Sequence, residues 1–144
     1  MDSAFKYVEA KGIELESTYP YTAADGTCQY DASKAVFKNT GYNDVPASDP
    51  AQLAAAVNKG PVSVAIEADQ FGFQFYSGGI FDGSCGTQLD HGVLVVGYGT
   101  DSGKDFWKIK NSWGASWGES GYIRFIKTST KGPGQCGLQL QASY

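Results

Sequence analysis

Two stretches of the chain carry apolar residues at helical spacing, residues 2–11 and residues 49–59. Asp49 stands where an N-cap is needed in the second stretch, and Pro50 follows at the first turn, where a missing N–H costs nothing. Gly12 ends the first pattern, and Gly60 follows the second. The pattern therefore predicts two short amphipathic helices.

After residue 60 the apolar residues change to a two-residue period. Residues 62–66 alternate strictly, and residues 92–99 are apolar without interruption, which predicts a strand buried on both faces. Residues 105–111 and 121–127 add further strands, and a short strand is expected at 36–40. Helices followed by several closely spaced strands indicate an α+β fold with an antiparallel sheet or barrel.

Composition narrows the classes of function. The 144 residues are enough for one domain with a core, and 19 glycines with 20 aromatic residues (3 Trp, 9 Tyr, 8 Phe) suit a β-rich fold with tight turns. The net charge is −4, and the sequence contains no run of like charges, so we expect neither nucleic acid nor a membrane surface as partner. No signal peptide is evident, and no apolar run approaches the ~18 residues of a membrane span.

The only histidine, His91, opens one apolar run, and Asn111 closes the next, 20 residues later. A histidine that moves protons for a nucleophile needs a partner that orients its ring, and an asparagine side-chain oxygen can do this without adding charge. Strand alternation places Trp107, Ile109 and Asn111 on one face. Trp113 then follows where it can shield a His91–Asn111 hydrogen bond from water.

Each of these residues also has an ordinary structural explanation. A lone histidine at a strand edge is commonly structural, asparagine favours turns, and tryptophan fills cores. Of the three cysteines, Cys85 is nearest to His91 in sequence, but it lies in an expected loop, without a helix N-terminus to activate it. One histidine and three widely spaced cysteines match no zinc spacing, so neither metal nor cofactor is expected.

The blocks around His91 and Asn111 resemble the papain family of cysteine proteases, which includes the cathepsins. The matching residues are Leu-Asp-His-Gly at 89–92, Val-Gly-Tyr-Gly at 96–99 and Phe-Trp-Lys-Ile-Lys-Asn-Ser-Trp-Gly at 106–114. Shorter matches occur in the family's order at Trp117-Gly118, Gly121-Tyr122, Tyr19-Pro20-Tyr21, 60–64, 76–81, Cys136-Gly137 and Ser143-Tyr144. The resemblance covers nearly the whole chain.

The resemblance implies an α+β, papain-like fold. Residues 1–144 would form a partial peptidase domain, with 1–12 a remnant helix of the helical left domain and about 13–144 the right domain, an antiparallel β-barrel or sheet. The family histidine lies ~130–150 residues after the nucleophilic cysteine, which places that cysteine roughly 40 residues before Met1. The family's cysteine motif and oxyanion glutamine are absent from these residues, so the chain resembles the C-terminal two thirds of a mature protease.

The resemblance also implies roles for individual residues. His91 would act as base and acid, Asn111 would orient it, Trp113 would shield the pair, and Trp117 would line the leaving-group side of the cleft. The positions that match the main substrate pocket predict a preference for an apolar or aromatic side chain: they are Ala65, Leu89, Asp90, Gly92 and, at the base, Gln141. Alternatively, Gln141 is an exposed polar residue near the C-terminus without a role in the pocket.

For the cysteines, the resemblance implies a disulfide between Cys85 and Cys136, with the partner of Cys28 outside these residues. Three reduced thiols in a cytosolic protein are the alternative.

The expected function is that of a thiol endopeptidase that hydrolyses peptides and proteins. The enzyme is expected to be lysosomal, vacuolar or secreted, and proteinaceous cysteine-protease inhibitors are expected to bind it. Without the N-terminal segment the isolated chain is expected to be inactive. There are two alternative interpretations of the chain: it is one chain of a two-chain protease, or it is a non-catalytic binding or structural homologue. A serine in place of the missing cysteine also stays open. The joint presence of His91, Asn111 and Trp113 favours a truncated enzyme.

Overall fold

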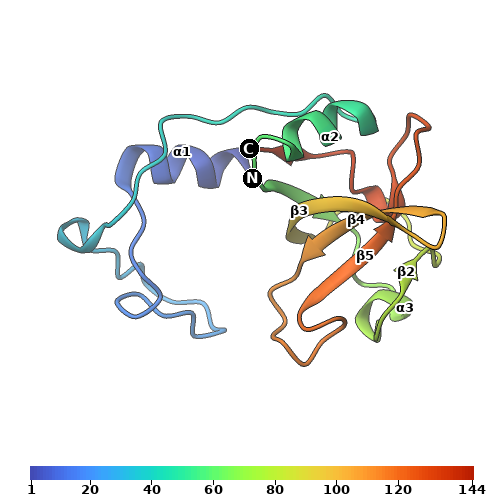
Figure 1. Cartoon of the computed structure of the whole chain (residues 1–144). Helices are drawn as coiled ribbons and strands as arrows, with labels where there is room; N and C mark the ends of the chain where they lie inside the picture. The colour runs from blue at the N-terminus through green and yellow to red at the C-terminus, as the bar shows by residue number, and fades with distance from the viewer. The chain divides into compact units, whose positions relative to one another are not determined.

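The computed structural model describes all 144 residues, which form two compact units. The N-terminal unit comprises Asp2–Tyr42, and the sheet unit comprises Asn43–Tyr144 together with Met1. Figure 1 shows both units along the chain. Residues 13–42 cluster with the first helix, so the boundary between the two compact units lies after Tyr42. The assignment of these residues to left and right domains stays a prediction.

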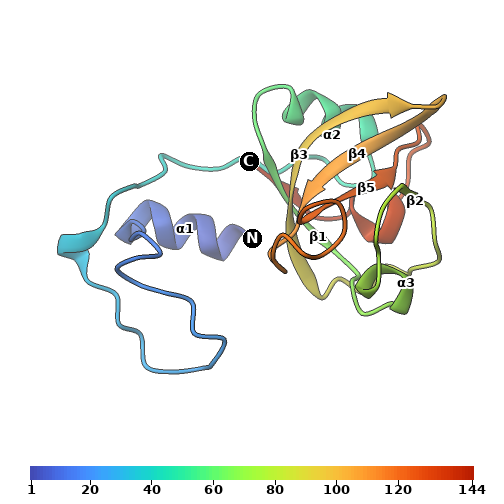
Figure 2. The same cartoon turned by 60° about the horizontal axis from the view of Figure 1, so that its bottom comes forward.

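The sheet unit is built on one six-stranded sheet. Its strands are β1 (Val62–Ile66), β2 (Ile80–Phe81), β3 (His91–Asp101), β4 (Lys104–Lys110), β5 (Tyr122–Ile126) and β6 (Ala142–Ser143). They lie in the order β2-β5-β4-β3-β1-β6. Neighbouring strands pair antiparallel except β2 and β5, which run parallel, and β3 and β4 form a long hairpin (Figures 1 and 2). The predicted α+β fold is confirmed.

One face of this sheet carries the core. Strict alternation in β1 buries Val62, Val64 and Ile66, as predicted. The prediction that 92–99 is buried on both faces is wrong, because only Val93 and Val95 are buried. On the other face the register places Leu94 between Ser63 and Lys110, a polar row that leaves it partly exposed. The other large side chains that are fully buried are Leu53, Phe73, Trp107, Ile109, Ile123, Phe125 and Leu138.

Helix α2 (Pro50–Val57) confirms the predicted second helix. The Asp49 side chain accepts hydrogen bonds from the N–H groups of Ala51 and Gln52 at 3.1 Å, which satisfies two otherwise unpaired donors of the first turn. The short helices α3 (Phe71–Gln74), which lies near β2 in Figures 1 and 2, and η2 (Gln135–Gly137), a 3-10 helix, were not predicted, nor were the two-residue strands β2 and β6. No helix of the chain is both long and apolar enough for a membrane span.

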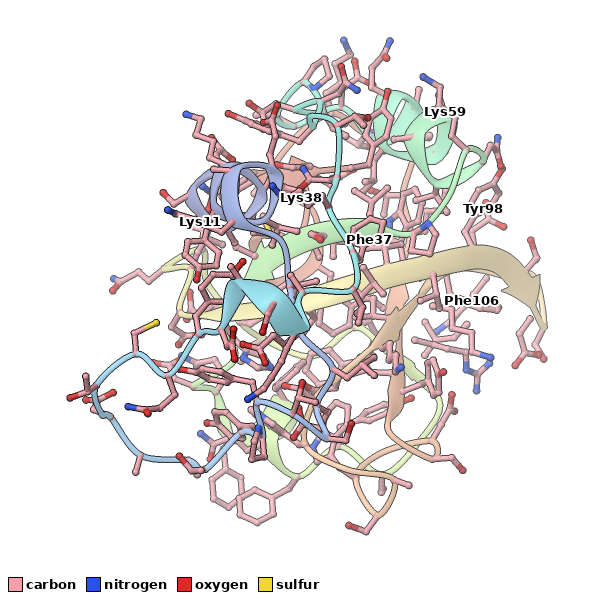
Figure 3. The ribbon with its side chains drawn as sticks, turned by 90° about the vertical axis from the view of Figure 1, so that its left-hand side faces the viewer. Lys11, Phe37, Lys38, Lys59, Tyr98 and Phe106 are labelled. Carbon is pink, nitrogen blue, oxygen red and sulfur yellow. A yellow bond between two sulfur atoms is a disulfide. The ribbon has the colours of Figure 1, made fainter.

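The N-terminal unit has almost no interior. It contains the predicted helix α1 (Asp2–Lys11) and the 3-10 helix η1 (Ala32–Lys34), and Lys38 extends back to α1, where its Nζ donates to the Ala10 carbonyl oxygen at 3.1 Å (Figure 3). The strand predicted at 36–40 is wrong. A single bridge between Ile13 and Phe37 forms instead, because no second strand continues the ladder.

Apolar side chains of this unit lie on its surface. None of the residues of α1 is buried, and Gly12 is the one buried residue of the unit. The exposed apolar residues are Tyr7, Ile13, Leu15, Tyr19, Tyr21, Val36 and Phe37. Burial of apolar side chains is the main driving force of folding, so this unit gains little stability from its own packing.

The Cys85–Cys136 disulfide expected from the resemblance is present, and it closes a loop with a sequence separation of 51. It connects the segment that precedes β3 to η2. Cys28 is free and exposed in the N-terminal unit.

Arg124 on β5 connects three separate parts of the sheet unit. Its Nε and Nη2 donate to the Glu119 carboxylate at 2.9 and 2.7 Å, and its Nη1 donates to Asp101 at 2.7 Å. Glu119 also accepts the Gly79 N–H at 2.9 Å. Hydrogen bonding to Arg124 lowers the pKa of Glu119 below its ordinary value, despite partial burial. This network fastens the loop between β4 and β5 to β5 itself.

We expect Glu119→Gln to lower the free energy of unfolding by roughly 1–2 kcal/mol at neutral pH, because it removes charge-assisted hydrogen bonds from a partly exposed site. A lowered native pKa contributes stability above the ordinary carboxylate pKa, and this stability is lost as the pH falls through the native pKa. Urea unfolding at neutral and acidic pH should therefore show the two proteins converging in acid. The exposed pair of Asp82 and Lys104 supplies the control, Asp82→Asn, for which little change is expected. Equal differences at both pH values would contradict the role of the charge.

Candidate active site

The hairpin of β3 and β4 brings His91 and Asn111 together. His91 is the first residue of β3, and Asn111 directly follows the last residue of β4. Because the two strands are antiparallel, with Leu94 opposite Lys110, the start of one lies beside the end of the other. His91 Nε2 lies 2.8 Å from Asn111 Oδ1. The two residues separated by 20 positions thus form one hydrogen-bonded pair.

The orientation of this pair follows from a second hydrogen bond. The Ser112 N–H, which can only donate, donates to the same Asn111 Oδ1 at 2.8 Å. This bond places the amide oxygen toward the imidazole, so His91 Nε2 must carry the proton that it shares with Asn111. In the neutral ring Nδ1 then keeps its lone pair and is the nitrogen free to accept a proton.

The side-chain nitrogen of Asn111 is unsatisfied. The residue is 7% exposed, and its Nδ2 is buried without a hydrogen-bond partner. Asn111 lines a hollow of about 420 Å³ together with Ser63, Leu94 and Lys110. The Nδ2 amino group carries two N–H donors and is costly to bury without an acceptor, so this side of Asn111 has capacity for up to two more hydrogen bonds.

Aromatic rings surround the pair. The Trp113 ring stacks on the His91 ring with centroids 5.0 Å apart and planes inclined by 29°, and it is 40% exposed. Phe73 from α3 contacts Trp113 edge-on at 5.3 Å and Trp117 at 5.2 Å. The Trp117 Nε1–H donates to the Gln74 carbonyl oxygen at 3.0 Å. Trp113 therefore shields one side of the imidazole, and Phe73 packs against the Trp113 ring.

Phe73 was missed by sequence analysis. Its segment, Phe-Gly-Phe-Gln-Phe-Tyr at 71–76, is rich in aromatic residues, but it is too short to show a helical period. The density of aromatic residues was the available signal.

Four of the five positions predicted for a substrate pocket lie around the paired ends of β1 and β3. Ala65 is directly opposite Gly92, and the Ala65 N–H donates to the carbonyl oxygen of the exposed Gln141 at 3.0 Å. Asp90 Oδ1 accepts the Ala68 N–H at 2.7 Å, so this carboxylate anchors the start of β3. Leu89, the fifth, is partly buried and packs on Gly137, where an added Cβ would lie 2.7 Å from Leu89 Cδ2.

The sheet unit holds the hydrogen-bonded His91–Asn111 pair but no free thiol. Its two cysteines, Cys85 and Cys136, are joined in the disulfide, and Cys28 belongs to the N-terminal unit. These residues can accept, hold and return a proton at His91 Nδ1, and they need a nucleophile from elsewhere.

Comparisons with known proteins agree with this arrangement. The family model described as "Papain family cysteine protease" matches residues 1–144. The chain is 50% identical over 146 residues to "Probable cysteine protease RD21B" of Arabidopsis thaliana, a match that covers all of this chain and 32% of the relative. It is 51% identical over 150 residues to "Cysteine proteinase EP-B 1" of Hordeum vulgare, covering 40% of that protein.

Solved structures give the same result for the fold. Bromelain from Ananas comosus, in complex with the E64 inhibitor, has a TM-score of 0.90 at 41% identity, over 99% of this chain and 67% of its own. Procathepsin L 3 from the larval midgut of Tenebrio molitor has a TM-score of 0.91 at 51% identity, over 100% of this chain and 47% of its own. The chain spans about a third to two fifths of the curated relatives, matching their C-terminal part. Sequence and structure therefore agree along the whole chain, which belongs to the papain family of cysteine proteases.

Proposed function

We propose that this chain is the part of a thiol endopeptidase that supplies the catalytic base, His91, and its orienting residue, Asn111. The single observation that carries the proposal is the 2.8 Å hydrogen bond between His91 Nε2 and Asn111 Oδ1, beneath the stacked Trp113 ring. A structural histidine needs no such arrangement, whereas a general base must be held in one tautomer and one orientation.

The chemistry follows from the free nitrogen. His91 Nδ1 takes the proton of a cysteine thiol, and the thiolate attacks the carbonyl carbon of the scissile peptide. The resulting imidazolium returns the proton to the leaving amine as the C–N bond breaks. In the second step Nδ1 takes a proton from water, the hydroxide attacks the thioester, and the thiolate leaves. Asn111 keeps the ring oriented in both steps.

We propose that the thiol comes from a part of the protein outside these 144 residues. The relatives extend well beyond the matched region, and a thiol is lacking in the sheet unit. The exposed apolar side chains of the N-terminal unit and the unpaired Cys28 support a further segment that packs on that unit, on the same chain or on a second chain.

The substrates proposed for the complete enzyme are peptides and proteins with an apolar or aromatic side chain beside the scissile residue. Ala65, Leu89 and Gly92 supply an apolar wall, and Gln141 supplies no charge at its base. Asp90 is held by the Ala68 N–H and contributes to positioning of the wall. Trp117 is assigned to the leaving-group side. Proteinaceous cysteine-protease inhibitors are expected to bind across the same surface.

We also propose a lysosomal, vacuolar or secreted location. The Cys85–Cys136 disulfide supports an oxidising compartment, since structural disulfides rarely persist in the cytosol.

The test is hydrolysis of fluorogenic peptides by the complete protein, with and without a thiol alkylator. We expect turnover that prefers an apolar residue at the pocket and that stops after alkylation, while residues 1–144 alone stay inactive. Turnover by residues 1–144 alone that is blocked by the alkylator would overturn the assignment of the nucleophile. A complete protein that binds peptides without cleaving them would favour a non-catalytic homologue.

Within this function, Asn111→Ala is expected to lower kcat/KM by about 10- to 100-fold, the equivalent of one lost hydrogen bond to a charged partner. The imidazole stays present but loses its fixed orientation. Asn58 is an exposed asparagine whose Oδ1 accepts a hydrogen bond from Tyr98, and Asn58→Ala is the matched control with unchanged activity. An Asn111→Ala enzyme with full kcat/KM would show that Asn111 does not orient the base.

A further inference from the structure

Glu67 is a buried acidic residue that the proposed chemistry does not use. It directly follows β1 and is 5% exposed. None of the ion pairs of the chain includes it. A buried carboxylate without a cation is unfavourable unless hydrogen-bond donors satisfy it, so its contacts reveal what it does.

Donors from two segments meet the Glu67 carboxylate. Its Oε2 accepts the backbone N–H of Gln88 at 2.6 Å, and its Oε1 accepts the Gln70 side-chain Nε2 at 2.9 Å. At Gly86 an added Cβ would lie 2.6 Å from Oε2, so the backbone there closes directly over the carboxylate. The Glu67 N–H donates to the Cys136 carbonyl oxygen at 2.9 Å, which fixes the base of the side chain.

The segment that hydrogen-bonds to Glu67 directly precedes His91 in the chain. Residues 86–90 contain no helix or strand, so no regular ladder fixes their backbone. At their end, the Asp90 N–H donates to the Ile66 carbonyl oxygen at 3.0 Å, and Asp90 Oδ1 accepts the Ala68 N–H at 2.7 Å. These bonds fix Asp90 and, next to it, His91. Leu89 lies between this anchor and the Gln88 anchor that Glu67 provides.

We propose that Glu67 is a positioning residue for substrate selection: it holds the Gly86–Gln88 backbone and thereby sets the position of Leu89 in the pocket wall. The statement about the pocket rests on the proposed function, whereas the hold on Gln88 does not. Glu67 acts through the backbone and touches neither substrate nor His91. Its carboxylate suits this role because it offers acceptors only, and both oxygens are used by donors.

The first experiment measures native-state amide hydrogen exchange on the full chain. Glu67→Leu keeps the volume but removes both acceptors, and we expect exchange of the Gln88 amide to rise by at least about tenfold. Glu67→Gln keeps one good acceptor, so a rise of about threefold is expected there. Core amides of Val64 and Val95 should stay unchanged in both variants. Equal acceleration of core amides and Gln88 would show a role in overall stability only and would overturn the proposal.

Asp69→Asn is the matched control. Asp69 is exposed, and it accepts the same Gln70 Nε2 at 2.8 Å but makes no hydrogen bond to Gln88. It removes one negative charge two residues from Glu67, so it should leave exchange at Gln88 unchanged. If Asp69→Asn reproduces the effect of Glu67→Gln, the effect belongs to charge or to Gln70 and not to the hold on Gln88.

The second experiment measures kinetics of the complete protease. With a substrate that carries an apolar side chain for the pocket, Glu67→Gln should raise KM severalfold and leave kcat within about twofold, because Leu89 contributes binding and His91 keeps its own anchors. A fall in kcat with unchanged KM would contradict the assignment to the pocket. Accelerated Gln88 exchange in a protein without peptidase activity would leave the structural hold intact and refute only the proposed function.

Discussion

Replacing His91 with alanine is expected to lower kcat of the complete protease by on the order of 10⁴- to 10⁶-fold. Without the imidazole no group in the sheet unit can take the proton of the thiol or return it to the leaving amine. His91 is the only histidine of these 144 residues, so no second imidazole of this part of the protein can substitute for it. The measurement is steady-state hydrolysis of a fluorogenic peptide, and KM should change far less than kcat.

Two comparisons make this result specific. Ser84→Ala, an exposed change in the loop before β3, should leave kcat unchanged. Unfolding of the His91→Ala protein in urea should show its core intact, because His91 is only partly buried and Phe73 and Trp117 still support Trp113. A folded His91→Ala enzyme that keeps a tenth or more of wild-type kcat would remove His91 from the mechanism.

Removing the Cys85–Cys136 disulfide should lower the free energy of unfolding by about 4 kcal/mol, the chain-entropy value for a closed loop of this length, with a sequence separation of 51. The bond joins the segment before β3 to η2. Without this cross-link the unfolded chain has many more accessible conformations, which favours the unfolded state. The experiment compares urea unfolding of the Cys85→Ala, Cys136→Ala double variant with wild type.

Cys28→Ala is the control for this change. Cys28 is free and exposed, and its removal should shift the free energy of unfolding by less than about 0.5 kcal/mol. A double variant as stable as the Cys28→Ala protein would show that the disulfide contributes nothing to stability in this chain.

Local sequence patterns predicted the regular elements well and the short ones poorly. The strict alternation of β1 and the Asp49 cap of α2 are signals contained within a few residues, and both are confirmed. By contrast, α3 and β2 are too short to show a period, and the parallel pairing of β2 with β5 depends on contacts far apart in sequence. The continuous apolar run at 92–99 gave a wrong prediction of burial, because Leu94 lies between Ser63 and Lys110, and only the register of three strands defines these neighbours.

The same division holds for the site. The two apolar runs, with His91 at one end and Asn111 at the other, indicated that the residues could meet, and the β3–β4 hairpin brings them within 2.8 Å. The tautomer depends on the Ser112 N–H, a backbone direction that no residue type specifies. Glu67 was not singled out, because an acidic residue at a strand end is normally solvent-exposed, and its burial depends on the loop that closes over it.

The source of the nucleophile is tested by mass-spectrometric mapping of the complete protein after inactivation by a thiol-directed epoxide. We expect one adduct, formed in step with loss of peptidase activity, on a cysteine outside Cys28, Cys85 and Cys136. We also expect the His91→Ala protein to form this adduct far more slowly. An inactivating adduct on Cys28, or peptide hydrolysis that persists after complete labelling, would contradict the proposal that His91 activates a thiol from outside these residues.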